Sequence, residues 1–164
     1  MQTLSALAAG AAMALTALGG AAWAQNSFGT GGMTVREVSA ILVSEGLAAK
    51  VAPGDEAGKI FSQLDGVAFE VLSANCSGGG RCTEFLFIAG FDLPDGFPIG
   101  RINEWNAEQL AGRAFLDHED DPFIDHVVSV SGPGDYGAMR EGLSLWRASL
   151  EAFVEFIDKP RADV

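Results

Sequence analysis

The last part of the chain carries the clearest pattern of apolar and polar positions. Seven apolar residues from Tyr136 to Ile157 recur at alternating spacings of three and four, which places them on one face of a helix. Asp135 precedes this pattern as a capping residue and Pro160 follows it. The spacing predicts a long amphipathic helix that packs on the protein's own sheet. A homodimer formed through the same face is the alternative.

Two shorter helices are predicted earlier in the chain. The first covers residues 34–45 and begins with Thr34 and Glu37, which form a capping box. The second covers residues 103–111, with Asn103 as its N-cap. The residues of this second helix that we expect to be buried are Trp105 and Leu110.

The remaining apolar runs predict five β-strands. They cover residues 59–64, 67–73, 83–91, 113–116 and 122–130. Asp65-Gly66 lies between the first two, and this dipeptide favours a tight hairpin turn.

The strand over residues 83–91 is apolar on both faces. Phe85 and Phe87 lie on one side, whereas Leu86 and Ile88 lie on the other. A strand of this kind is covered twice, either by helices or by a partner. Phe85 and Phe87 are therefore candidate partner-binding residues.

The predicted elements follow the order helix-strand-strand-strand-helix-strand-strand-helix. Neighbouring strands joined by short turns indicate an antiparallel sheet of about five strands with three helices, which is the α+β class. We assign residues 33–158 to a single domain, residues 25–32 to a flexible lead-in and residues 159–164 to a short tail.

Residues 1–24 are typical of a signal peptide. The stretch has no charged side chain, is rich in Ala and Leu, and ends in a small-x-small pattern that a signal peptidase cuts between Ala24 and Gln25. The protein is therefore predicted to be periplasmic or secreted. An uncleaved anchor is the alternative, but alanine is only marginally favourable in a membrane. We expect no stable membrane anchor.

The formal net charge of −12 restricts the partners. An acidic surface repels phosphate backbones and anionic lipids, which argues against nucleic acid and membrane-surface binding. Basic or neutral partners are favoured. Acidity also keeps an exported protein soluble, and that interpretation needs no partner.

Cys76 and Cys82 are the two cysteines, and they flank a glycine-rich segment. In an oxidising compartment the pair is predicted to form a disulfide that closes a hairpin. The spacing is not C-x-x-C, and two thiols are too few ligands for a metal site.

Motifs that would indicate catalysis are missing, so we predict no enzymatic activity and no cofactor. The sequence has no G-x-S-x-G, no H-E-x-x-H, no phosphate loop and no dinucleotide fingerprint. The acidic turn over residues 117–121, with nearby Asp125, offers oxygen ligands for calcium. It lacks the glycine and the distal glutamate of an EF-hand, so we favour a solvated turn and predict no metal.

His126 shares a strand face with Ile124 and Val128. We interpret it as a core or sheet-edge histidine with a hydrogen-bond partner. A pH sensor is one alternative. A hydrolase that uses His126 with Asp125 or Asp117 is another.

Several of these features together resemble the YbjN domain family of bacterial proteins. They are Asp65-Gly66 before a strand, the Cys76/Cys82 loop, the segment Asn103-Glu104-Trp105-Asn106, and a last helix rich in Trp and Phe. The resemblance covers about residues 33–157, and the Asn-x-Trp-Asn segment before the Arg-Ala-Phe-Leu strand is its most specific part. It implies a fold like that of type III secretion chaperones and a role as a sensory transduction regulator. It names no ligand or reaction.

The sequence therefore predicts a non-enzymatic exported regulator or adaptor that binds a protein or peptide partner. The candidate binding residues are Asn103, Trp105, Asn106, Phe85 and Phe87. The alternative is a small-ligand-sensing domain with a pocket near Trp105.

Overall fold

The computed structural model describes residues 31–54, 58–132 and 134–159. Its elements are β1 (Met33–Thr34), α1 (Val35–Ser44), β2 (Ala48–Val51), β3 (Lys59–Leu64), β4 (Val67–Cys76), β5 (Arg81–Gly90), α2 (Ile99–Glu108), β6 (Arg113–Leu116), β7 (Pro122–Ser129) and α3 (Tyr136–Asp158). The predicted signal peptide, its cleavage site after Ala24 and the lead-in up to residue 30 lie outside the described residues.

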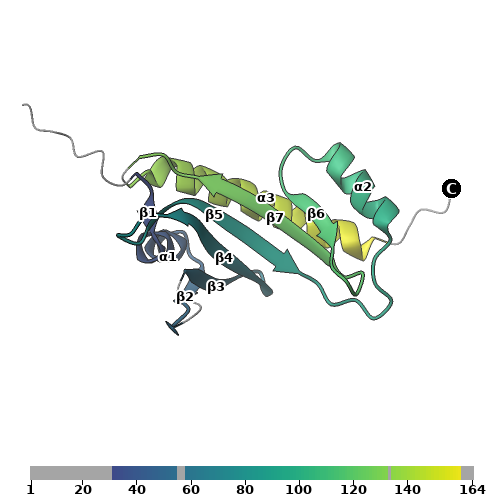
Figure 1. The fold of residues 1–164 in the computed structure, drawn as a ribbon. Coiled ribbons are helices and arrows are strands. Elements are labelled where there is room, and N and C mark those ends of the chain that lie inside the picture. The colour runs from purple at the N-terminus through teal and green to yellow at the C-terminus, as the bar shows by residue number, and fades with distance from the viewer. Residues whose placement is uncertain (1–30, 55–57, 133, 160–164) are drawn as a thin grey trace, which may run out of the picture.

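The strands form one open antiparallel sheet in the order β2-β3-β4-β5-β7-β6, and β1 pairs with the start of β5 (Figure 1). The α+β class is confirmed. The described sheet has seven strands, which is more than the five predicted. None of the described helices is long and apolar enough to cross a membrane.

The two strands that sequence analysis missed are β1 and β2. In β2 the side chains are mostly exposed and do not alternate between apolar and polar. Its position is fixed by pairing with β3, where the Ser62 hydroxyl donates to the Ala48 carbonyl oxygen at 2.6 Å. Strands this short depend on tertiary pairing, so their own sequence carries little signal.

One face of the sheet is covered by α1 and α3. Phe69, Phe87 and Trp146 lie at its centre, with the Trp146 ring centroid 5.5 Å from that of Phe69 and 5.9 Å from that of Phe87. Met139, Leu143, Leu150 and Phe153 extend this core along α3. The predicted amphipathic helix is therefore confirmed, with Asp135 as its N-cap.

Gly142 allows α3 to lie close to the sheet. A Cβ atom at this position would overlap the side chain of Val128 on β7. Glycine lowers intrinsic helix stability, so its presence in the helix interior reflects this close approach.

The position of α2 differs from the prediction. The helix begins at Ile99 after Pro98, because proline has an extended conformation there and cannot continue a preceding hydrogen-bonded turn. Asn103 consequently lies in the middle of the helix, where it is exposed and caps nothing. The helix ends at Glu108, so Leu110 lies in the following loop and is 105% exposed instead of buried.

The predicted capping and turn features of the N-terminal half are confirmed. The Thr34 hydroxyl accepts a hydrogen bond from the Glu37 N–H, and the Glu37 carboxylate accepts one from the Thr34 N–H at 2.7 Å. Asp65 and Gly66 both have positive φ values, 49° and 89°, as a tight β3–β4 hairpin requires. Cys76 and Cys82 lie opposite each other on β4 and β5, with their sulfur atoms at disulfide distance, 2.05 Å.

Candidate binding face of the sheet

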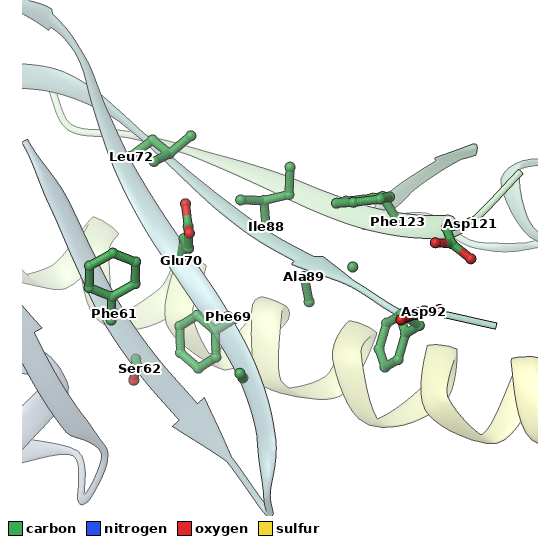
Figure 2. Close-up of a pocket in the computed structure, with 13 residues that line it drawn as sticks. Phe61, Ser62, Phe69, Glu70, Leu72, Ile88, Ala89, Asp92, Asp121 and Phe123 are labelled. Atoms are coloured by element: carbon green, nitrogen blue, oxygen red, sulfur yellow. The ribbon is translucent and has the colours of Figure 1, made fainter. Parts of the chain in front are cut away.

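The sheet has a second face, opposite α1 and α3, which we call the open face. Strand alternation places every other side chain of β3, β4, β5 and β7 on it. The half-buried apolar residues there are Phe61, Leu72, Leu86, Ile88 and Phe123. Figure 2 shows Leu72, Ile88 and Phe123 on the side of the strands away from α3, whereas Phe69 and Ala89 point towards it. No described helix covers the open face.

A cleft of about 520 Å³ opens on the open face where β4 and β5 separate, and it extends between the strands to Phe69 and Ala89. The two strands pair from Cys76 and Cys82 as far as Glu70 and Ile88, and beyond that point they diverge. Phe61, Leu72, Ile88 and Phe123 are among the residues that line the cleft (Figure 2). Gly90 contributes by its lack of a side chain, because a Cβ atom there would overlap the Phe123 ring.

Carboxylates surround this apolar cleft. Glu70, Asp92 and Asp121 line it together with the apolar residues (Figure 2). Glu70 pairs with Lys59 at 3.6 Å, and Asp121 accepts a hydrogen bond from the Leu93 N–H at 2.9 Å.

An acidic hollow of about 560 Å³ adjoins the cleft and shares Asp92 and Asp121 with it. Its other acidic residues are Asp95, Glu119 and Asp120. The hollow lies between the loop after β5 and the turn that joins β6 to β7.

The acidic turn is organised by its own backbone. The Asp117 carboxylate accepts hydrogen bonds from the N–H groups of Glu119 and Asp121 at 2.9 and 3.0 Å. These bonds hold the pKa of Asp117 below its ordinary value. Asp117, Glu119 and Asp121 have oxygen atoms within 4.8 Å of one another, but the hydrogen bonds account for the arrangement without a cation.

Phe85 and Phe87 lie in the core and not on the open face. They are 1% and 0% exposed, which leaves them inaccessible to a partner. The side chains that the same strand presents on the open face are Leu86 and Ile88. The sequence predicted that β5 would be apolar on both faces, and only one of those faces is covered by described helices.

Trp105 and Asn106 join α2 to β6 and α3. Trp105 is 2% exposed, packs edge-on against Phe153 with centroids 4.9 Å apart, and donates its indole N–H to the Gly112 carbonyl oxygen at 2.7 Å. The Asn106 amide donates to the Ala114 carbonyl oxygen and accepts from the Ala114 N–H, both at 2.9 Å. These contacts hold α2 against the sheet. Trp105 lines neither the cleft nor the acidic hollow.

His126 and Asp125 do not form a catalytic pair. As neighbours on β7 they point to opposite faces, and the buried Asp125 carboxylate forms an ion pair with Arg113. His126 is partly buried, and this burial lowers the pKa of its imidazole although nearby Asp125 opposes the shift. Asp125 therefore cannot orient His126 as the base of a hydrolase.

The fold and the open face define an α+β domain in which the described helices cover one side of the sheet. A family model, YbjN, described as "Putative bacterial sensory transduction regulator", matches residues 34–159. The chain therefore belongs to the YbjN family. No curated protein matches the chain, and no solved structure matches it.

The family description names a regulator and not an enzyme. It specifies neither the partner nor the signal. The likeness to type III secretion chaperones, which the resemblance implied, stays a prediction.

Proposed function

We propose that this protein is an exported, non-enzymatic regulator that binds a polypeptide segment on the open face of its sheet. The observation that carries the proposal is the group of five half-buried apolar side chains on the open face, four of which line the cleft and none of which a described helix covers. Exposed apolar surface of this kind marks interaction sites in soluble proteins. The family description supports a regulatory role in general terms.

An extended peptide suits this surface better than a globular domain does. The apolar residues lie on four neighbouring strands, β3, β4, β5 and β7, and the cleft where β4 and β5 separate, about 520 Å³, can admit a large side chain from an extended segment. Fully burying a Leu or Phe side chain stabilises a complex by about 1.5–3 kcal/mol. Two such anchors would give measurable binding before any hydrogen bond is counted.

A small apolar ligand is the second candidate occupant. The cleft volume of about 520 Å³ falls within the size range of small-molecule sites. This alternative places the ligand on the open face, since Trp105 is enclosed in the core.

The proposal is tested with a photocrosslinking amino acid at Ala68, an exposed residue that lines the cleft. The matched control carries it at Ala148, which is exposed on α3 at the other side of the sheet. We expect one dominant protein adduct from position 68. The same adduct should be missing from position 148, and it should disappear from position 68 when Ile88→Asp is added. Equal adducts from both positions, or none from position 68, would contradict peptide binding.

Export is a separate part of the proposal and has its own measurement. We expect the protein recovered from the periplasm to begin at Gln25, so its intact mass should lack residues 1–24. A periplasmic or membrane species that retains Met1 would contradict cleavage. Recovery from the cytoplasm alone would contradict export.

A further inference from the structure

We infer that the polypeptide bound on the open face is cationic: a large apolar side chain enters the cleft, and neighbouring Lys or Arg residues lie in the acidic hollow. This inference rests on the proposed function and specifies the chemistry of the partner. It depends on two properties of the surface, the continuity of the cleft with the hollow and the sign of the charge around both.

Continuity follows from the residues that the two cavities share. Asp92 lies two residues after the end of β5, and Asp121 comes directly before β7. Both line the apolar cleft and the acidic hollow. One extended segment can therefore contact both cavities with neighbouring residues, because each residue of an extended chain adds only about 3.3 Å.

The charged side chains that line the two cavities have a single sign. Six acidic residues line them, namely Glu70, Asp92, Asp95, Glu119, Asp120 and Asp121, and neither lining contains a Lys or Arg. Lys59 on β3 does not line the cleft, but it pairs with Glu70 at 3.6 Å and partly balances the charge of that carboxylate. A concave surface lined by one charge concentrates the electrostatic potential and raises the association rate of ligands of opposite sign.

Four of these carboxylates are free to meet a ligand. Asp92, Asp95, Glu119 and Asp120 are exposed and form no ion pair within the described part of the chain. The Asp121 carboxylate, by contrast, accepts a hydrogen bond from the Leu93 N–H. Asp92, Asp95 and Asp120 are neutralised in the test, because replacing them leaves this loop hydrogen bond intact.

The experiment selects random dodecapeptides displayed on phage against the purified protein at low salt. Selection against the Ile88→Asp protein serves as background. Enriched sequences are then made as synthetic peptides, and their affinities are measured by fluorescence anisotropy. We expect an aromatic or large aliphatic residue next to Lys or Arg, and affinity that falls as salt is raised.

The decisive comparison uses two triple variants that change the net charge equally. Asp92→Asn/Asp95→Asn/Asp120→Asn neutralises three of the five acidic residues that line the hollow, and asparagine tolerates the positive φ of 62° at position 120. Glu108→Gln/Glu141→Gln/Glu151→Gln neutralises exposed residues on α2 and α3. We expect the first variant to weaken binding roughly tenfold and the second less than about twofold, with thermal melts confirming that both fold.

The outcomes separate this inference from the proposed function. Enriched peptides that are neutral or acidic, yet lose binding with Ile88→Asp, would overturn the cationic partner and support peptide binding on the open face. Equal weakening by the two triple variants would overturn the assignment of the basic residues to the hollow. The absence of any enrichment over background would overturn both proposals.

Discussion

Two asparagines on α2 have the same chemistry and different surroundings. Both residues are exposed, but the Asn106 amide makes two hydrogen bonds to the backbone of Ala114, whereas no side-chain hydrogen bond is seen for Asn103 within the described residues. Each such bond contributes about 0.5–1.5 kcal/mol net. We expect Asn106→Ala to lower the free energy of unfolding by about 1–3 kcal/mol in urea titrations.

Asn103→Ala is the matched control for that measurement. Because Asn103 is exposed in a helix interior, we expect its substitution to change stability by less than about 0.5 kcal/mol. Similar losses from the two variants would mean that the contact between Asn106 and β6 contributes nothing specific.

Glu37 makes the stability depend on pH. Its pKa is lowered chiefly by the hydrogen bond from the Thr34 N–H, with further help from the Thr34 hydroxyl and from Arg81 at 3.2 Å, while burial opposes the shift. Since the folded-state pKa lies below the ordinary value of 4.5, this contribution is complete above that pH and is lost as pH falls through the folded-state pKa.

We therefore expect Glu37→Gln to lower the thermal midpoint at neutral pH and to leave a smaller difference from wild type in acid. Melting curves recorded between neutral pH and about pH 3 measure this change. Glu151→Gln, at an exposed position on α3, provides the control. A difference between Glu37→Gln and wild type that stays constant over the whole range would contradict the assignment.

At the residue scale, the sequence correctly predicted positions that depend only on whether a side chain is buried. Trp105 was expected to be buried and is, because a tryptophan amid helical spacing has few other stable positions. The role of Asn106 could not be predicted, because its partner Ala114 lies on a strand and the contact depends on how α2 docks. The prediction that Leu110 is buried was wrong, because it assumed a helix that continues to residue 111, whereas α2 ends at Glu108.

At the scale of elements, the approach of α3 to β7 depends on the absence of a side chain at position 142. A Gly→Ala change in a helix interior normally stabilises it by about 0.5–1 kcal/mol. Here the added methyl group would overlap Val128, so we expect Gly142→Ala to lower the free energy of unfolding. Chemical denaturation measures the change.

Gly137→Ala on the same helix is the control. An added Cβ atom there meets nothing closer than the Asp135 carboxylate at 4.0 Å. We expect this variant to be neutral or slightly more stable than wild type. If Gly142→Ala behaved in the same way, the close contact between α3 and β7 would not be needed for stability.

The β4–β5 hairpin is expected to depend on the oxidation state of Cys76 and Cys82. Closing the short loop between them stabilises the folded protein by about 2 kcal/mol on the loop-entropy argument. We expect a reductant to lower the free energy of unfolding of the oxidised protein by about that amount.

Cys76→Ser removes the bond at the exposed cysteine and leaves the buried Cys82 side chain in the core. This variant should match the reduced protein and should not respond to reductant. A wild-type protein that is equally stable in both redox states would contradict the stabilising role.

The long elements could be predicted because each carries several periods of its own pattern. The residues of α3 define its buried face over 23 positions, and Asp65-Gly66 specifies the β3–β4 turn locally. The start of α2 could not be predicted in this way. Asparagine is a favourable N-cap residue, so the sequence indicated a start at Asn103, whereas the N-cap in the structure is Pro98. The four residues of β2 contain no period, so only their pairing with β3 defines them.

At the scale of the whole molecule, the sequence predicted only part of the difference between the covered face and the open face of the sheet. The sequence showed that β5 is apolar on both faces. Such a strand is covered on both faces, either by helices alone or by helices on one face and a partner on the other. It could not show which face receives the helices, because that choice depends on how α1 and α3 pack together. The candidate site therefore moved from Phe85 and Phe87 to Leu86 and Ile88.

The contact between Asn106 and Ala114 has a consequence for how copies of the protein meet in solution. β6 is the last strand at one margin of the sheet, and the Asn106 amide occupies the outward N–H and C=O of Ala114 that a strand from another molecule would need. Unpaired margins of this kind template aggregation. The Asn106 side chain therefore leaves the backbone of Ala114 unavailable to a strand from another molecule at the β6 margin.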